Sequence, residues 1–247
     1  MKKTICDSNQ IAYQHRGSNE KIILFIHGLG CSKRSFHDAF SQNYFPNEYT
    51  LIAPDLLGHG ESASPDNSQY DMQDHATLVK NMLDQFEYRE LNIVAHSMGG
   101  AVALLLTNFI DKIHSIALLE GNLILEDCKI SRRVAKMGED KFVNGVFPRA
   151  PINYRCQGNE SDPEINPKAY FRSAKSLVEW SSSGKLLDIY TNLSIRKSYI
   201  YGDRNSSMPV ISRLNEATVF EIPNSGHFMM NDNPEDTYAV IAKNLDS

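Results

Sequence analysis

The sequence predicts an α/β fold with a mostly parallel central sheet covered by helices on both faces. Short apolar stretches of strand length alternate with stretches whose apolar spacing fits helices. Residues 101–110 are apolar nearly all round, which indicates a helix buried in the middle of such a fold. The chain has 247 residues, 41% of them hydrophobic, and this is enough for one sizeable core.

Eight stretches are predicted to form strands, most of them apolar runs that end at a glycine, a proline or a polar turn. The fourth is broken by Pro54 and continues into a glycine-rich turn. In chain order the stretches are TIC (4–6), IAYQHRG (11–17), KIILFIHG (21–28), YTLIAP (49–54), LNIVAH (91–96), IHSIALLEG (113–121), SIRKSYIYG (194–202) and ATVFEIP (217–223).

Two further helices are predicted. In 71–86 the apolar residues recur on one face. In 234–245 the start is marked by Asn233 as N-cap, by Pro234 at the first helical position and by two acidic residues in the first turn.

Residues 122–193 differ from the rest, with weak periodicity and several prolines between two predicted strands. We expect a mostly helical cap inserted after the strand that ends at Glu120, over a core formed by 1–121 and 194–247. A solvated helix face explains the basic residues of this segment, and an anionic substrate is the alternative. These residues are Arg132, Arg133, Lys136, Lys141, Arg149 and Arg155.

The overall charge excludes some classes of partner. A formal charge of -5 gives no basic excess for nucleic acid, and every apolar stretch is too short to cross a bilayer. The spread of the cysteines favours free thiols over disulfides or a zinc site, and no histidine spacing indicates a metal. We therefore expect a cytoplasmic protein without metal or cofactor; the oligomeric state is not indicated. The cysteines are Cys6, Cys31, Cys128 and Cys156.

The stretch NIVAHSMGGAV (92–102) places Ser97 where a buried strand meets a buried helix. A nucleophile on such a corner stands out at the carboxyl edge of the sheet, and the tight turn requires small flanking residues, here Ala95 and Gly99. The helix start adds N–H groups where negative charge would develop on a substrate oxygen. The alternative is a serine N-cap before a glycine-rich helix.

The stretch AHSMGG (95–100) resembles the nucleophile elbow of the α/β-hydrolase superfamily, G-x-S-x-G, with Ala95 in place of the first glycine. The resemblance extends over residues 22–245, is weakest in 122–193, and implies the α/β-hydrolase fold with Ser97 as nucleophile. The other motifs follow in the family's order: HGLG (27–30), DLLGHGES (55–62) and SGHFMMNDNPE (225–235).

His227 follows the last strand, on a loop before the last helix. A lone histidine there is ordinarily a surface residue, but a serine nucleophile needs a neighbouring base and imidazole suits that role. The resemblance also implies that the HGLG loop forms an oxyanion hole, with backbone N–H groups from Leu29 and Met98; otherwise the loop is a simple turn. The residues expected to line a substrate pocket are His27, Gly28, His96, Trp180 and Phe228.

The acidic member of a triad is less clear. In the family it stands in the turn after the seventh strand, three residues after its glycine, and that position holds Asn205, which cannot ionise. Asp203 lies two residues too early. Glu120 ends the strand after the elbow helix, where some α/β-hydrolases, including a branch that resembles haloalkane dehalogenases, carry the acid. Glu120 is favoured over Asp203, and both stay open.

A serine at the elbow argues against the mechanisms of haloalkane dehalogenases and epoxide hydrolases, which use a carboxylate nucleophile. We expect a carboxylesterase-type hydrolase that forms an acyl-enzyme on Ser97 with a small-molecule ester or acyl substrate. Thioesters, lactones and carbon–carbon bonds of diketones are within what the resemblance implies. The alternatives are a ligand- or partner-binding protein of this fold with little catalysis, and a cofactor-free haloperoxidase or perhydrolase.

Overall fold

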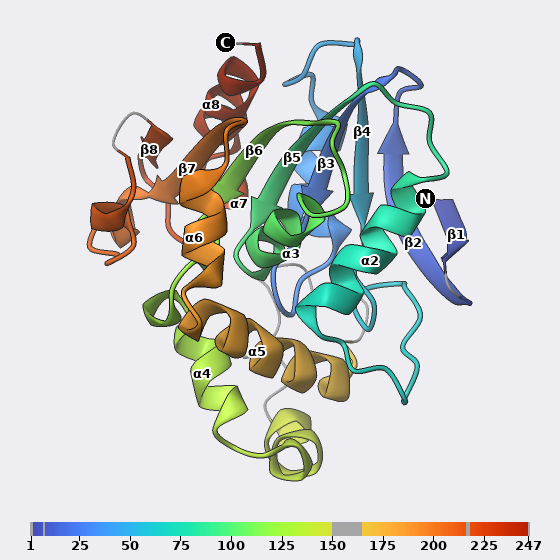
Figure 1. Cartoon of the computed structure of the whole chain (residues 1–247), viewed down its shortest axis with the longest axis vertical. Coiled ribbons are helices and arrows are strands. Elements are labelled where there is room, and N and C mark those ends of the chain that lie inside the picture. Colours follow the sequence, from blue (N-terminus) through green and yellow to red (C-terminus); the bar gives the residue numbers. More distant parts are fainter. Residues whose placement is uncertain (1, 7, 150–164, 216–217, 247) are drawn as a thin grey trace.

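All eight predicted strands are present and form one sheet in the order β1-β2-β4-β3-β5-β6-β7-β8 (Figure 1). The computed structural model describes residues 2–6, 8–149, 165–215 and 218–246. The strands are β1 (Lys2–Cys6), β2 (Asn9–Arg16), β3 (Lys21–Ile26), β4 (Tyr49–Pro54), β5 (Glu90–His96), β6 (Ile113–Leu119), β7 (Arg196–Gly202) and β8 (Val219–Ile222).

The sheet is mostly parallel, as predicted. Only the first two strands run against their neighbours: β1 pairs antiparallel with β2, and β2 antiparallel with β4. The remaining pairs, from β4 across to β8, are parallel. Parallel strands end at the same edge, so the loops that follow β3, β5, β6 and β7 meet there.

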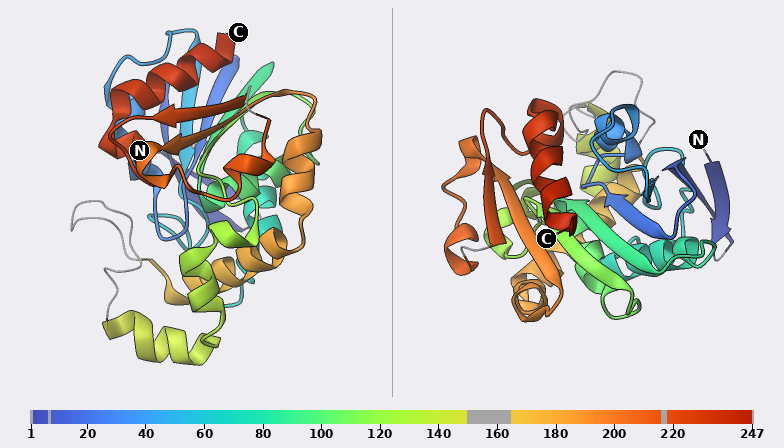
Figure 2. Two further views of the ribbon diagram at one scale, coloured as in Figure 1. Left: turned by 90° about the vertical axis from the view of Figure 1, so that its left-hand side faces the viewer. Right: turned by 90° about the horizontal axis from the view of Figure 1, so that it is seen from above.

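Helices cover both faces of the sheet (Figure 2). Residues alternate between the faces along β3: Ile22 and Leu24 pack on one side, Ile23 and Phe25 on the other. The first side is covered by α2 (Met72–Leu83), α3 (Met98–Leu106) and α6 (Lys185–Asn192). The second is covered by η1 (Lys33–Phe36), α1 (His37–Ser41), α7 (Met229–Asp232) and α8 (Pro234–Asp246). Asn233 caps α8 by accepting a hydrogen bond from the Asp236 N–H at 3.3 Å.

In its described residues, 120–149 and 165–195, the segment between β6 and β7 is mostly helical, as predicted. Two of its helices, α4 and α5, lie beyond the carboxyl edge of the sheet, at the bottom of Figure 1. They share a small apolar cluster of their own that includes Val134, Phe142 and Phe171. The elements are η2 (Leu125–Asp127), α4 (Lys129–Ala135), the π-helical turn η3 (Lys141–Val146), η4 (Phe147–Arg149), α5 (Pro167–Ser182) and α6.

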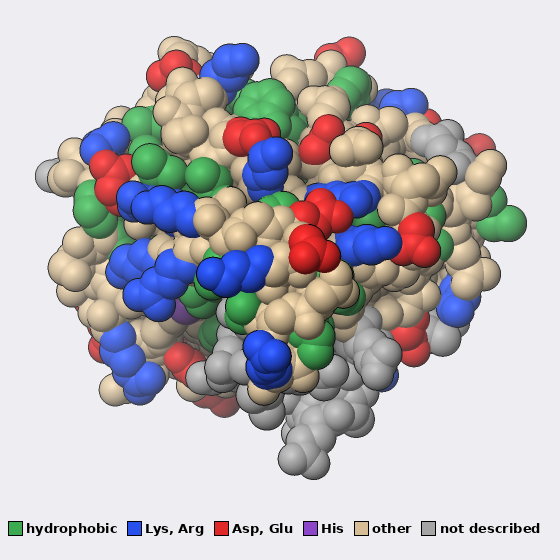
Figure 3. Space-filling view, turned by 90° about the horizontal axis from the view of Figure 1, so that it is seen from below, with side chains coloured by type: hydrophobic (Ala, Val, Ile, Leu, Met, Phe, Trp, Pro, Cys, Tyr) green, Lys and Arg blue, Asp and Glu red, His purple; other side chains and the backbone are tan. Residues whose placement is uncertain are grey.

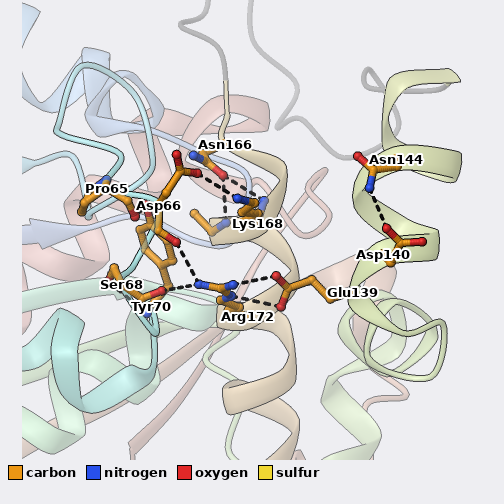
Figure 4. A network of polar contacts seen from close by, with 11 residues as sticks. Pro65, Asp66, Ser68, Tyr70, Glu139, Asp140, Asn144, Asn166, Lys168 and Arg172 are labelled. Carbon is orange, nitrogen blue, oxygen red and sulfur yellow. Dashed lines mark hydrogen bonds and ion pairs between the residues drawn. The ribbon is translucent and has the colours of Figure 1, made fainter.

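Polar contacts join α5 to the loop before α2 (Figure 4). Arg172 donates to both carboxylate oxygens of Glu139, at 3.0 and 2.7 Å, and to the Ser68 carbonyl at 2.6 Å. Lys168 pairs with Asp66 at 2.9 Å. Arg172 therefore links this loop to the turn that precedes η3.

Asp55, just after β4, is fully buried and pairs with the Lys33 ammonium. Its carboxylate accepts from the Lys33 N–H at 2.7 Å, the Lys33 ammonium at 2.5 Å and the Glu61 N–H at 2.8 Å. A Cβ at Gly60, where φ is +55°, would lie 2.3 Å from the Asp55 carboxyl carbon. The glycine-rich turn can therefore wrap closely around this carboxylate only without a side chain at that position.

Three findings concern the cysteines, membrane-spanning helices and metal ligands. Cys31 is disulfide-bonded, whereas Cys6 and Cys128 are free, so the prediction of free thiols is wrong for Cys31. Cys156 and Arg155 lie outside the described residues. The disulfide removes the cysteine argument for a reducing compartment. Among the described residues, no helix is long and apolar enough to span a membrane, and no group of His, Cys, Asp or Glu side chains is arranged to hold a metal ion.

Replacing Lys33 with methionine should destabilise the protein by about 3–5 kcal/mol, because it leaves the buried Asp55 charge without its partner. Lys21→Met is the matched control. It removes a pair with Glu48 that is partly exposed, and should cost less than about 1 kcal/mol. Urea unfolding of both variants measures the difference, and equal small losses would contradict it.

Candidate active site

Ser97 occupies a strained corner between β5 and α3. Its backbone angles φ and ψ are 52° and −119°, a region that residues other than glycine rarely adopt. The backbone is held there because the Ser97 N–H donates to the Leu119 carbonyl at 3.0 Å and its carbonyl accepts from the Gly100 N–H at 2.9 Å. The end of β6 therefore helps to fix the position of the serine at the end of β5.

The start of α3 packs directly on the end of β3. A Cβ at Gly99 would lie 2.4 Å from the Ile26 carbonyl oxygen, so only glycine allows this approach. The packing brings the HGLG loop beside the corner, since a Cβ at Gly28 would lie 3.1 Å from Ser97 Cβ. Met98 is the first residue of α3, and helices leave their first N–H groups without an internal acceptor.

Glu120 contacts His227. The carboxylate oxygen Oε2 lies 2.7 Å from His227 Nδ1, and the residue is only 2% exposed. The Gly202 N–H and the Asn205 amide also donate to this carboxylate. Burial would raise the pKa of Glu120, but the contact with His227 and these donors outweigh it and hold that pKa below its usual value.

Asp203 is turned elsewhere. Its carboxylate accepts from the Asn224 N–H at 2.8 Å and the Ser225 N–H at 3.0 Å, and these bonds lower the pKa of Asp203. It thereby fixes the turn just ahead of His227. Of the two carboxylates considered from sequence, the structure brings Glu120 to the histidine and uses Asp203 in the loop.

Two further histidines have structural contacts. His96 Nε2–H donates to the His227 carbonyl at 2.8 Å, and the rings lie 4.6 Å apart. Burial, and then the charge of His227, lower the pKa of His96 well below its usual value, so His96 is neutral. His27 is fully buried, bonded to the Gly28 carbonyl and the Leu56 N–H at 2.8 and 2.9 Å, and burial lowers its pKa to about 3.

These side chains open onto a cavity of about 420 Å³. Of the five residues expected to line a pocket, Gly28, His96 and Phe228 do so. His27 does not, because it bonds to the backbone below. Trp180 does not either: it packs beside the main core under the Lys185 ammonium, 5.6 Å from the ring centre. Other lining residues are Leu29, Cys31, Ser97, Glu120, Asn122, Asp127, Cys128, Ser131, Tyr170, Asn205, Met208 and His227.

Sequence reasoning missed Asn122. The Ser97 hydroxyl donates to Asn122 Oδ1 at 3.1 Å, and Asn122 Nδ2 donates to the Asp127 carbonyl at 3.0 Å. In the described contacts the serine hydroxyl is thus directed at Asn122 and not at His227. The only signal in the sequence was its place two residues after Glu120, at a strand end that faces the elbow.

Sequence reasoning also missed Asp127. Its Oδ2 accepts from the Leu123 and Ile124 N–H groups, both at 3.1 Å, while its Oδ1 is buried without a partner among the described residues. Burial outweighs these two bonds and raises the pKa of Asp127 to about 6. Ionisation of the Asp127 carboxylate near neutral pH therefore lowers the stability of the folded state.

The outer surface beyond the cavity is basic. Lys and Arg side chains gather on the face seen in Figure 3. In the segment between β6 and β7, Lys129, Arg133, Lys136 and Lys141 are exposed. Of the described basic residues in this segment, only Lys129 lines the cavity. Among those named from the sequence, Arg133, Lys136, Lys141 and Arg149 are exposed, as the solvated-face interpretation expects, while Arg132 is half-buried.

Asp127→Asn should change stability in a pH-dependent way. The folded wild type binds more protons than the unfolded chain between about pH 4 and 6, so its free energy of unfolding falls across that window. Relative to wild type, the variant should gain up to about 3 kcal/mol from pH 4 to pH 8. Urea unfolding at both pH values measures this. Asp66→Asn should shift the opposite way, mainly below about pH 4, since the hydrogen bond from Lys168 lowers the pKa of Asp66. Its measurement is therefore extended below pH 4, and a shift of the same sign as that of Asp127→Asn would contradict the assignment.

Comparisons with solved structures identify the same architecture. A haloalkane dehalogenase, DbeA of Bradyrhizobium elkani, superposes with a TM-score of 0.78 at 18% identity, over 98% of this chain and 96% of the other. An N-acyl homoserine lactonase, AidH, gives 0.77 at 16%, over 98% and 96%. An esterase of Thermogutta terrifontis gives 0.71 at 18%, over 98% and 95%. At these identities the likeness concerns the fold alone.

Sequence relatives cover different shares of the chain. An uncharacterized protein of Mycobacterium tuberculosis is 25% identical over 272 residues, covering 96% of this chain and 78% of its own. A probable lysophospholipase of Arabidopsis thaliana, BODYGUARD 4, is 35% identical over 101 residues, 40% of this chain and 24% of its own. The family model described as alpha/beta hydrolase fold matches residues 21–146, just over half of the sequence. With this match, the sheet topology and the serine corner, the chain belongs to the α/β-hydrolase fold family.

Proposed function

We propose that the protein is a serine hydrolase that cleaves a carboxylic ester, or a related thioester, lactone or C–C bond, through an acyl-enzyme on Ser97. The observation that carries this proposal is the 2.7 Å contact between His227 Nδ1 and the buried Glu120 carboxylate, beside a serine on a strained corner. All three side chains line one cavity. A base oriented by a carboxylate, next to an exposed hydroxyl, is the arrangement that nucleophilic acyl transfer requires.

The reaction begins with a rotation. The Ser97 hydroxyl leaves Asn122 and turns to His227, which takes its proton as the oxygen attacks the substrate carbonyl. The N–H groups of Leu29 and Met98 stabilise the oxyanion, and each such donor is worth roughly 3 kcal/mol of barrier. His227 then returns the proton to the leaving group, and water releases the acyl group by the same steps. None of these steps uses a cofactor.

The segment 122–193 serves, in this proposal, as a cap over the core formed by 1–121 and 194–247. Cys128, Ser131 and Tyr170, from the start of α4 and from α5, line the cavity opposite the serine. They therefore contact the acyl or alcohol part of a substrate, and the cavity of about 420 Å³ suits a small molecule. The lactonase and esterase among the structural neighbours act on substrates of this class by their names.

One observation favours a second candidate, a ligand-binding protein with little catalysis. The Ser97 hydroxyl bonds to Asn122, so in this structure the proton is not directed at the base. The haloalkane dehalogenase reaction is not a candidate despite the shared fold, because Ser97 stands where that mechanism needs a carboxylate.

Hydrolysis of p-nitrophenyl acetate distinguishes these candidates and identifies the acid. Wild type should turn over the ester, with Ser97→Ala as the blank. Glu120→Gln should lose on the order of ten-thousandfold in kcat, because the amide cannot fix the imidazole tautomer or stabilise the imidazolium. Asp203→Asn should stay within a few-fold, since that carboxylate bonds to the backbone of its own loop.

Labelling by a fluorophosphonate probe provides a measurement that does not depend on the ester chosen. Wild type should be labelled once, at Ser97, and Ser97→Ala not at all. If folded wild type is neither labelled nor active, the binding-protein candidate replaces the hydrolase. If Asp203→Asn loses activity and Glu120→Gln does not, the assignment of the acid is wrong.

A further inference from the structure

Asn205 contacts the carboxylate that faces His227. It lies in η6 (Asp203–Asn205), directly after β7, and its side-chain amide is 3.0 Å from both Glu120 Oε1 and Oε2. The amide nitrogen is therefore shared between the two oxygens. In the sequence, Asn205 stands out only as the residue that occupies the family's acid position.

The contacts around Glu120 leave no room for another donor. Oε1 receives the Gly202 N–H at 3.1 Å and the Asn205 amide; Oε2 receives the same amide and His227 Nδ1 at 2.7 Å. These four contacts match the number of lone pairs that a carboxylate offers. Because the residue is 2% exposed, water cannot easily replace a missing donor.

The backbone of Glu120 is itself strained, with φ at 43°. A residue other than glycine in this region costs of order 1–3 kcal/mol and persists only where its surroundings hold it. The Glu120 N–H donates to the Ile200 carbonyl at 2.9 Å, and the side chain is held from the far side by Asn205. The turn after β7 therefore fixes the direction in which the carboxylate points.

We propose that Asn205 is a positioning residue for catalysis, which holds the Glu120 carboxylate ionised and aimed at His227 by donating its amide to both oxygens. The proposal rests on the hydrolase function above. An amide is the residue that complements a carboxylate here, because a second carboxylate 3.0 Å away would repel the first. Once the acid is at position 120, an amide at position 205 is required and aspartate is unfavourable.

The other titratable groups around this pair do not provide the same effect. His96 faces His227 but burial keeps it neutral, and burial likewise raises the pKa of Tyr199 on β7 well above its usual value. Asp127 bonds to the Leu123 and Ile124 N–H groups. In the same turn, Asp203 bonds to the backbone ahead of His227, and Arg204 to the Asn224 carbonyl.

The test follows the rate of fluorophosphonate labelling of Ser97 against pH, which needs no knowledge of the natural substrate. Asn205→Ala should slow labelling on the order of ten- to a hundredfold, the effect of losing a hydrogen bond to a charged group. Asn205→Asp, which is nearly isosteric, should move the midpoint of the pH profile upward by roughly one pH unit or more, since added negative charge stabilises the protonated imidazole.

Asn47→Asp is the matched charge control. Asn47 is exposed and precedes β4, so it lies at the opposite edge of the sheet from the site. This variant should keep the wild-type rate and midpoint. A residue with a merely structural role would lower the fraction of molecules labelled, measured by intact mass, and leave the midpoint unchanged.

The outcomes separate the two proposals. If folded wild type is neither labelled nor active, the hydrolase function fails and this inference with it. If wild type is labelled but Asn205→Asp has the wild-type midpoint, the inference alone is overturned, whether or not Asn205→Ala folds. An upward shift seen with Asn205→Asp and absent with Asn47→Asp supports it.

Discussion

The burial of one negative charge, on Glu120, is the constraint on which the rest of the site depends. A carboxylate that is 2% exposed is stable only with donors around it, and β7, its following turn and the loop after β8 each provide one or more. The same requirement explains why His227 lies against the end of β6. Compensation of this buried charge therefore determines the arrangement of the loops at the sheet edge as much as apolar packing does.

The hydrophobic layers make this arrangement possible. The alternation of side chains along β3 fills a core on each face of the sheet, and α3 is buried on every side. The start of α3 is pressed against β3 so closely that Gly99 cannot carry a side chain. Packing on both faces of the sheet therefore supports the strained backbone at Ser97 and at Glu120, in addition to the turn after β7 that holds the Glu120 side chain.

Much of the fold could be predicted from the sequence because its signals are local. Runs such as KIILFI, and the caps of α8 at Asn233 and Pro234, depend on neighbours in the chain. The serine corner was also visible, since its small flanks adjoin it. For the partner of His227, the sequence favoured Glu120 over Asp203 without deciding between them. The contact of Asn205 with Glu120 was not visible, because these two residues are far apart in the sequence and meet only through the pairing of β6 with β7. Asn122 was missed for the same reason, since it meets Ser97 across 25 residues of sequence, and so was the disulfide at Cys31. Asp127 has local partners, Leu123 and Ile124, and was missed because its burial depends on the tertiary fold.

In the proposed mechanism, molecules whose Ser97 hydroxyl is bonded to Asn122 exchange with molecules whose hydroxyl has turned to His227, so two populations exist at equilibrium. Only the population whose hydroxyl has turned away can attack, so an apparent rate constant is the intrinsic one multiplied by that fraction. Every 1.4 kcal/mol by which Asn122 is preferred lowers the reactive share about tenfold. A ligand that brings its own donor to Asn122 would release the hydroxyl on binding, and would thereby activate the nucleophile that attacks it.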